Sequence, residues 1–298
     1  MVNQSLLEAV SENGYRPSDH HLSKENVYRS VNPEDPTSYK LQEFRMYDSE
    51  GRIAMKGYCN PDGSIYAQAF RKYDENGNFI VQYTGDESSD SAVNKCYVDE
   101  KGRLDHSESS LGYTCVYAYD DDDHRIYQKT TDSNGTLIRE TKVLYENDLP
   151  KEDTTRFYQE DGSFGSCQKR VWIYDEEGQI LTTRLSYLDE KSQEIDFEEV
   201  RYIYTRDVSG KIVNCDSTVY FGSYNSFEKT VTTYEYEGDL LIGESAVRTL
   251  GETETIVQYV CAYTYDEQNR LIRSSQRLNW AGGGRETCIE NHEYRNNE

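Results

Sequence analysis

The sequence predicts an all-β protein: a long antiparallel β-meander of about 18 strands in roughly nine hairpin repeats, forming a curled or spiralling sheet. Three observations predict it. A turn motif recurs with a mean period of about 27 residues. The segments between turns alternate like strands. The 298 residues include 27 tyrosines, which bring large buriable area to a chain poor in aliphatic residues.

The first class of turn consists of an aromatic residue, an acidic residue, two polar residues, Gly or Asn, a further polar or basic residue and an aliphatic residue. Gly, Asn and Asp tolerate the positive φ of tight turns, and an Asp at the first corner can accept hydrogen bonds from the backbone of the turn. Nine copies, some degenerate, occur at 47–53, 73–79, 98–104, 119–126, 145–149, 174–180, 206–212, 236–240 and 265–271.

A second class of turn, looser in composition, lies between successive copies of the first. Two turns in each period leave strands of roughly eight to ten residues, about 30 Å long. We therefore read each repeat as a strand pair. The second-class turns lie at 60–63, 84–86, 110–112, 132–135, 160–162, 189–193, 221–223, 250–252 and 281–284.

The number of strands predicts a sheet that curls without closing. Open twisted sheets of more than roughly ten strands curl or split. A barrel of about 18 strands would leave a lumen too wide for side chains to fill. We therefore expect a spiral shell or a flattened roll, with one face half wet and tyrosine hydroxyls reaching water.

The turns at Tyr47, Tyr73 and Tyr174, with the Asn-bearing copy at Tyr265, resemble the YD-repeat or RHS-repeat family over about residues 40 to 298. This resemblance implies a β-strip that spirals into a hollow shell, often one that encloses a toxin or mediates cell contact. The chain differs from the large RHS toxins, because it has no Asp-Pro-x-Gly cleavage region near its end and no room for a toxin domain.

The first 38 residues differ from the repeats. Ser5–Val10 is predicted to form a short helix, and Asn32–Pro36 an extended link. We expect residues 1–38 to be a helical and extended segment that caps the exposed first strand, and residues 39–298 to be the β-repeat domain.

Charge and composition restrict the function. The formal charge of -23 excludes a basic nucleic-acid binder. Residues 1–14 lack the features of a secretory signal, and no apolar stretch has membrane-spanning length. These observations predict a bacterial cytoplasmic protein without membrane contact. The seven cysteines lie far apart and are expected to be buried, reduced thiols.

The densest acidic run, Asp120, Asp121, Asp122 and Asp123, is the predicted partner-binding site. A calcium loop is an alternative, but the glycine that such a loop uses for its sharp turn is missing. A merely solvated turn is the other interpretation. A strongly acidic surface speeds and orients association with a basic partner.

No catalytic, metal or cofactor site is predicted. The pair His20–His21 has no further ligand at metal-binding spacing. His106, His124 and His292 are isolated in the sequence, and no Gly-x-Ser-x-Gly elbow is present. Trp172 and Trp280 could stack on sugar rings, although a tryptophan in a strand is more often core.

We therefore predict a non-catalytic protein-binding repeat protein, specifically an immunity-type neutraliser of a basic toxin. Two alternatives stay open: a carbohydrate- or surface-binding β-repeat module, and a structural RHS-like shell fragment. An enzyme is not expected, and the sequence leaves the oligomeric state undetermined.

Overall fold

The computed structural model describes residues 22–30, 39–60, 62–84, 92–223, 226–251 and 254–294. These residues form twenty β-strands, all in one antiparallel sheet. The helix predicted at residues 5–10 and the pair His20–His21 lie outside the described ranges. No helix in the described part of the chain is long and apolar enough to cross a membrane.

The chain divides into two compact units. Unit 1 comprises residues 1–111, 235–245 and 257–298. Its strands are β1 (Leu22–Ser30), β2 (Lys40–Tyr47), β3 (Ile53–Cys59), β4 (Ile65–Tyr73), β5 (Phe79–Thr84), β6 (Ala92–Val98), β7 (Leu104–Ser109), β19 (Leu271–Trp280) and β20 (Arg285–Tyr294), with most of β18 (Glu254–Tyr265).

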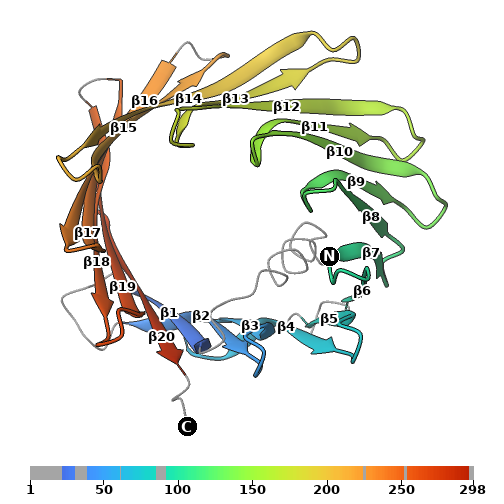
Figure 1. Cartoon of the computed structure of the whole chain (residues 1–298), viewed down its shortest axis with the longest axis horizontal. Helices are drawn as coiled ribbons and strands as arrows, with labels where there is room; N and C mark the ends of the chain where they lie inside the picture. The colour runs from blue at the N-terminus through green and yellow to red at the C-terminus, as the bar shows by residue number, and fades with distance from the viewer. Residues whose placement is uncertain are drawn as a thin grey trace. The chain divides into compact units, whose positions relative to one another are not determined.

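Unit 2 comprises residues 112–234 and 246–256, and β17 (Leu240–Leu250) has residues in both units. The strands of unit 2 follow one another in sequence order (Figure 1, green to orange). They are β8 (Thr114–Tyr119), β9 (Arg125–Thr131), β10 (Leu137–Glu146), β11 (Leu149–Tyr158), β12 (Phe164–Tyr174), β13 (Ile180–Leu188), β14 (Glu194–Arg206), β15 (Ile212–Phe221) and most of β16 (Ser226–Glu237).

The sheet is closed, which corrects the predicted open, spiralling meander of about 18 strands. In unit 1, β1 pairs with β2 on one side and with β20 on the other (Figure 1, blue beside red). The prediction required side chains to fill the interior, whereas large barrels enclose water instead. Pairing of the first and last strands satisfies the backbone donors and acceptors that two open edges would expose.

Within the described residues the predicted turns lie between successive strands, and the strand count was wrong for two reasons. Eighteen turns separate nineteen strands rather than 18, and these are β2 to β20. The twentieth strand is β1, which lies within the segment 1–38 that was expected to be a cap. The all-β, antiparallel character of the prediction is confirmed.

Most first-class turns share one local geometry, while the turn at 145–149 is shorter, with Glu146 paired directly with Leu149. In the turn after β12, the Asp175 carboxylate accepts the backbone N–H groups of Glu177 at 2.9 Å and Gln179 at 2.8 Å. Gly178 takes a φ of 80°, which only glycine adopts without strain. The aspartate and the glycine thus fix the register of such a hairpin, which explains why the motif recurs.

The tyrosine of the motif has a role that the sequence reasoning missed. Its hydroxyl was expected to reach water, but in several repeats it donates to a backbone carbonyl of the preceding repeat. Tyr174 bonds the carbonyl of Pro150, and Tyr265 that of Leu241, each at 2.8 Å and 24 residues earlier. These bonds tie consecutive hairpins together.

The core is made of small and polar side chains as well as apolar ones. In unit 1 Val81 and Ala92 are fully buried, and Cys96 almost so. All seven cysteines are free, and every one except Cys288 is buried, as predicted.

Candidate functional site

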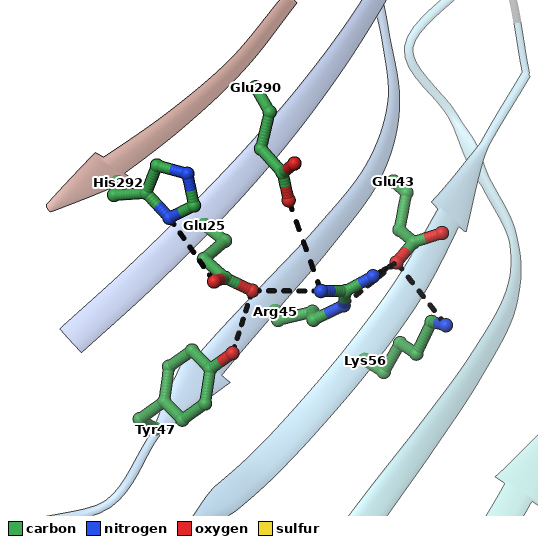
Figure 2. A network of polar contacts seen from close by, with 7 residues as sticks. All are labelled: Glu25, Glu43, Arg45, Tyr47, Lys56, Glu290 and His292. Atoms are coloured by element: carbon green, nitrogen blue, oxygen red, sulfur yellow. Dashed lines mark hydrogen bonds and ion pairs between the residues drawn. The ribbon is translucent and has the colours of Figure 1, made fainter. Parts of the chain in front are cut away.

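A network of polar contacts surrounds Glu25 of β1, where the first and last strands meet (Figure 2). In the antiparallel register, Glu25 lies opposite Arg45 of β2 and opposite His292 of β20. Paired residues project to the same face of a sheet, so all three side chains converge. We call the group Glu25, Glu43, Arg45, Tyr47, Lys56, Glu290 and His292 the seam network; all its members belong to unit 1.

Both oxygens of Glu25 have partners. The Tyr47 hydroxyl donates to Oε2 at 2.6 Å, and Arg45 Nη1 donates to the same oxygen at 3.0 Å. His292 Nδ1 lies 3.2 Å from Oε1. The hydroxyl of Tyr47 thus donates to a side-chain carboxylate, whereas the motif tyrosines of later repeats donate to a backbone carbonyl.

These contacts decide the charge state of the carboxylate. Burial raises the pKa of Glu25, but the hydrogen bonds with His292 and Tyr47 and the charge of Arg45 outweigh it, so the pKa falls to about 2. Conversely, burial and the neighbouring carboxylate raise the pKa of Tyr47 well above its usual range. Glu25 is therefore an anion, and Tyr47 a neutral donor, at neutral pH.

The rest of the network balances charge around Arg45. Its guanidinium contacts Glu43 at 2.7 Å, and Lys56 contacts the same carboxylate at 3.2 Å. Glu290 lies 3.9 Å from Arg45 Nη1 and keeps 31% of its side chain exposed, against 10% for Glu25.

The charged side chains of the seam network neutralise one another, and some of them could also bind a cation. Single ligand atoms of Glu25, Glu290 and His292 all lie within 4.8 Å of one another. Mixed carboxylate and imidazole donors suit zinc-type divalent ions. No metal was predicted from the sequence, because His292 was considered in isolation; its partner Glu25 is 267 residues away.

The four predicted site residues occupy the turn between β8 and β9 in unit 2. Asp120 holds the turn: its Oδ1 accepts the backbone N–H groups of Asp122 at 3.1 Å and His124 at 2.9 Å. Desolvation raises the pKa of Asp120, but hydrogen bonds from His124 outweigh it and lower the pKa. Asp121, Asp122 and Asp123 are exposed.

The structure adds a neighbouring turn to this run. His124 stacks on Tyr145 of β10, with ring centroids 4.4 Å apart and planes at 12°. Its Nε2 lies 3.6 Å from Oδ1 of Asp148, in the turn between β10 and β11. The acidic run is thus continued by the next first-class turn.

Acidic residues concentrate at this end of the strands of unit 2. The four turns at 120–124, 146–149, 175–179 and 207–211 hold ten acidic residues and one lysine. The three turns described at the opposite end, 132–136, 159–163 and 189–193, hold five acidic residues and one lysine. Asp121, Asp122 and Glu176 have no ion-pair partner within the described ranges.

Exposed aliphatic side chains lie close to these acidic turns. Leu144, Ile173 and Ile203 are 59%, 53% and 70% exposed. The strand registers place all three on one face of the sheet, near the ends of β10, β12 and β14. Leu144 also borders a cavity of about 240 Å³ lined by charged side chains of β10 and β11. We call these three residues the aliphatic row.

The remaining predicted candidates are accounted for structurally. His106 stacks on Tyr97, with centroids 4.3 Å apart, and its Nδ1 lies 2.7 Å from Asp105. Trp280 is 47% exposed at the end of β19. The turn 281–284 joins β19 to β20 as a hairpin, not a strand to a helix.

No family model matches the chain, and no curated protein does. Three similar solved structures illustrate the range of likeness. A porin-like protein from Bacteroides uniformis matches with a TM-score of 0.42 and 9% identity over 92% of this chain and 96% of its own. A porin-like protein from Bacteroides vulgatus matches with a TM-score of 0.36 and 11% identity, over 76% of this chain and 99% of its own. The TcdB2–TccC3 complex matches with a TM-score of 0.31 and 10% identity, over 83% of this chain but only 17% of its own.

The described strands form a β-rich fold, as the resemblance to YD-repeat proteins implied, while membership of that family is not shown. The predictions of a cytoplasmic location and of no membrane contact are wrong for this fold. They rested on the lack of an apolar helix, whereas a closed sheet with an even number of antiparallel strands is an arrangement that also spans outer membranes.

Proposed function

We propose that the protein is a non-catalytic binding protein that uses the acidic turns and the aliphatic row of unit 2 to hold a basic protein partner. One observation carries the proposal: exposed aliphatic side chains and unpaired carboxylates occur together at one end of this unit. Protein interfaces combine an apolar centre with a polar rim, and complementary charge speeds and orients the encounter.

The charges within the sheet support the same assignment. Next to the row, Glu152 pairs with Lys169 at 2.7 Å, and Glu199 pairs with Arg184 at 2.9 Å and with Arg201 at 2.6 Å. These charges neutralise one another, whereas Asp121, Asp122 and Glu176 at the turns do not. The unbalanced negative field therefore comes from the turns and favours a basic partner. The immunity-type role assumed a cytoplasmic protein and is not proposed further.

Paired variants test the proposal. Native protein and variants are used to capture partners from an extract of the source cells, and captured proteins are identified by mass spectrometry. Asp121→Asn with Glu176→Gln removes two unpaired charges, while Glu160→Gln with Glu190→Gln removes two at the opposite end. Ile203→Ser removes one aliphatic side chain, and Ile195→Ser is its control, because both isoleucines are 70% exposed on β14.

We expect one basic partner whose affinity falls about tenfold in either site variant and stays unchanged in either control. Its affinity should also decrease with added salt. Partners that tolerate both site variants would overturn the proposal. So would binding of the native protein to lipid vesicles that is lost in Ile203→Ser, because the row would then be a membrane contact.

A further inference from the structure

We infer that the seam network contains a binding site for one divalent metal ion of the zinc type, held by Glu25, Glu290 and His292. The two carboxylates and the imidazole come from β1 and β20, the first and last strands of the sheet. Their ligand atoms all lie within 4.8 Å of one another. An ion bound here would join the two strands that close the sheet.

The distances fit coordination. Glu25 Oε1 and His292 Nδ1 lie 3.2 Å apart. Two ligands bound to one ion at roughly 2.0–2.2 Å have about this separation. The other oxygen of Glu25, Oε2, is held by Tyr47 and Arg45, so the carboxylate already has a fixed orientation. Outer hydrogen bonds of this kind orient ligands in metal sites.

The imidazole is held in a largely buried position. His292 is 11% exposed, and its Nδ1 faces Oε1 of Glu25. Its other ring nitrogen, Nε2, lies on the opposite side of the ring and has no hydrogen-bond partner among the described residues. Nδ1 is therefore the nitrogen that would bind the ion beside Glu25.

The local charge also favours a cation. The seam network has three carboxylates, those of Glu25, Glu43 and Glu290, against the two cations Arg45 and Lys56 (Figure 2). Arg45 is engaged mainly with Glu43, at 2.7 Å, and only loosely with Glu290, at 3.9 Å. Glu290 is therefore free to turn toward an ion beside His292. Three protein ligands leave a further position for water.

The test uses the full chain with the change His124→Gln, because Asp122, His124 and Asp148 form a second, more exposed group of possible ligands. Zinc chloride is titrated calorimetrically, and cobalt chloride is titrated with detection of visible absorption. We expect one ion per chain, bound about tenfold or more weakly after the added change Glu290→Gln or His292→Gln. Glu286→Gln is the control, since Glu286 lies on β20 and pairs with Arg29 instead.

Thermal unfolding distinguishes a variant that has lost metal binding from a variant that has failed to fold. Zinc should raise the midpoint of thermal unfolding in the His124→Gln protein and in its Glu286→Gln control, but not after His292→Gln. Glu290 is partly exposed, so its variant should fold with an unchanged midpoint when no metal is present. Absence of stoichiometric zinc binding to the His124→Gln protein would overturn the inference, as would unchanged affinity after both ligand substitutions.

Discussion

The hydroxyl of Tyr204 donates a hydrogen bond to the backbone carbonyl of Ile180, 24 residues earlier, at 2.8 Å. The same relationship recurs at nearly the repeat length. It explains why tyrosine rather than phenylalanine stands at or just before the start of several turn motifs: the ring packs on the sheet while the hydroxyl satisfies a carbonyl of the preceding hairpin. Equivalent bonds join Tyr73 to Ile53, Tyr174 to Pro150, Tyr265 to Leu241 and Tyr294 to Leu271.

Removing one such bond should measurably weaken the fold. We expect Tyr204→Phe to lower the free energy of unfolding by about 1 kcal/mol, the usual net value of one hydrogen bond. Urea denaturation provides the measurement. Tyr202→Phe is the matched control, because its ring stacks on Tyr204 at 6.2 Å but its hydroxyl has no hydrogen bond among the described residues. Equal losses in the two variants would contradict a role for the hydroxyl.

The same tyrosine predicts a response to alkali. Burial, with the nearby Cys215, raises the pKa of Tyr204 to about 12 from an ordinary value of 10.0. Because the folded pKa lies above the unfolded one, the stabilising contribution is complete below pH 10 and is lost as pH rises toward 12. Titration followed by tyrosinate absorption should show one late-ionising tyrosine fewer in Tyr204→Phe, whose alkaline unfolding should also be less steep.

An opposite pH dependence is expected from the turns. Hydrogen bonds from the backbone N–H of Arg270, partly opposed by desolvation and assisted by its guanidinium, lower the pKa of Asp266. Its contribution is therefore complete above the unfolded pKa near 3.8 and is lost as pH falls through the lower folded value. In native protein, the free energy of unfolding should therefore decrease on acidification, which acid unfolding followed by circular dichroism measures. Asp266→Asn should reduce that acid-dependent part, whereas Glu267→Gln, in the same turn, should leave it unchanged.

Glycine 57 is required by the ring of Phe44. A Cβ atom built on Gly57 would lie 2.4 Å from two ring carbons of Phe44, on the paired strand β2. Gly57→Ala should therefore cost about 1–3 kcal/mol of unfolding free energy, as overpacking does. Gly282→Ala, which meets no atom within 4 Å and has no positive φ, should be nearly neutral in the same denaturation experiment.

The seam network should behave as a coupled unit. The Tyr47 hydroxyl bonds a charged carboxylate, so Tyr47→Phe should cost about 2 kcal/mol of unfolding free energy. In a Glu25→Gln background the same change should cost clearly less, because the charged acceptor is gone. A double-mutant cycle from denaturant unfolding measures the difference. Additive effects would show that the hydroxyl stabilises the protein independently of Glu25.

Local chemistry explains what was predictable. Asp175 and Gly178 encode a hairpin within five residues, so the positions of the turns and the antiparallel pairing could be derived from the sequence. The run from Asp120 to Asp123 was correctly assigned to a turn. Its use as a binding site stays a prediction, and the structure adds His124, Tyr145 and the turn at Asp148 beside it.

Features that depend on distant residues were not predictable. The strand β1 is largely polar, and its pairing with β20 leaves no local trace in the sequence. The contact between Glu25 and His292 therefore escaped notice, as did the closed sheet. Ile173 and Ile203 were equally hidden, because alternating aliphatic residues in a strand normally indicate core, and only the structure shows them exposed.

The pairing of β1 with β20 has a kinetic consequence. The other described pairings join strands that are neighbours in sequence, which meet after closing short loops. Val27 and Glu290, by contrast, must find each other across nearly the whole chain. The entropy lost in such an encounter grows with the length of the intervening chain, and non-local contacts slow folding. The hairpins should therefore form first, and the pairing of β1 with β20 should be the last and rate-limiting step of folding.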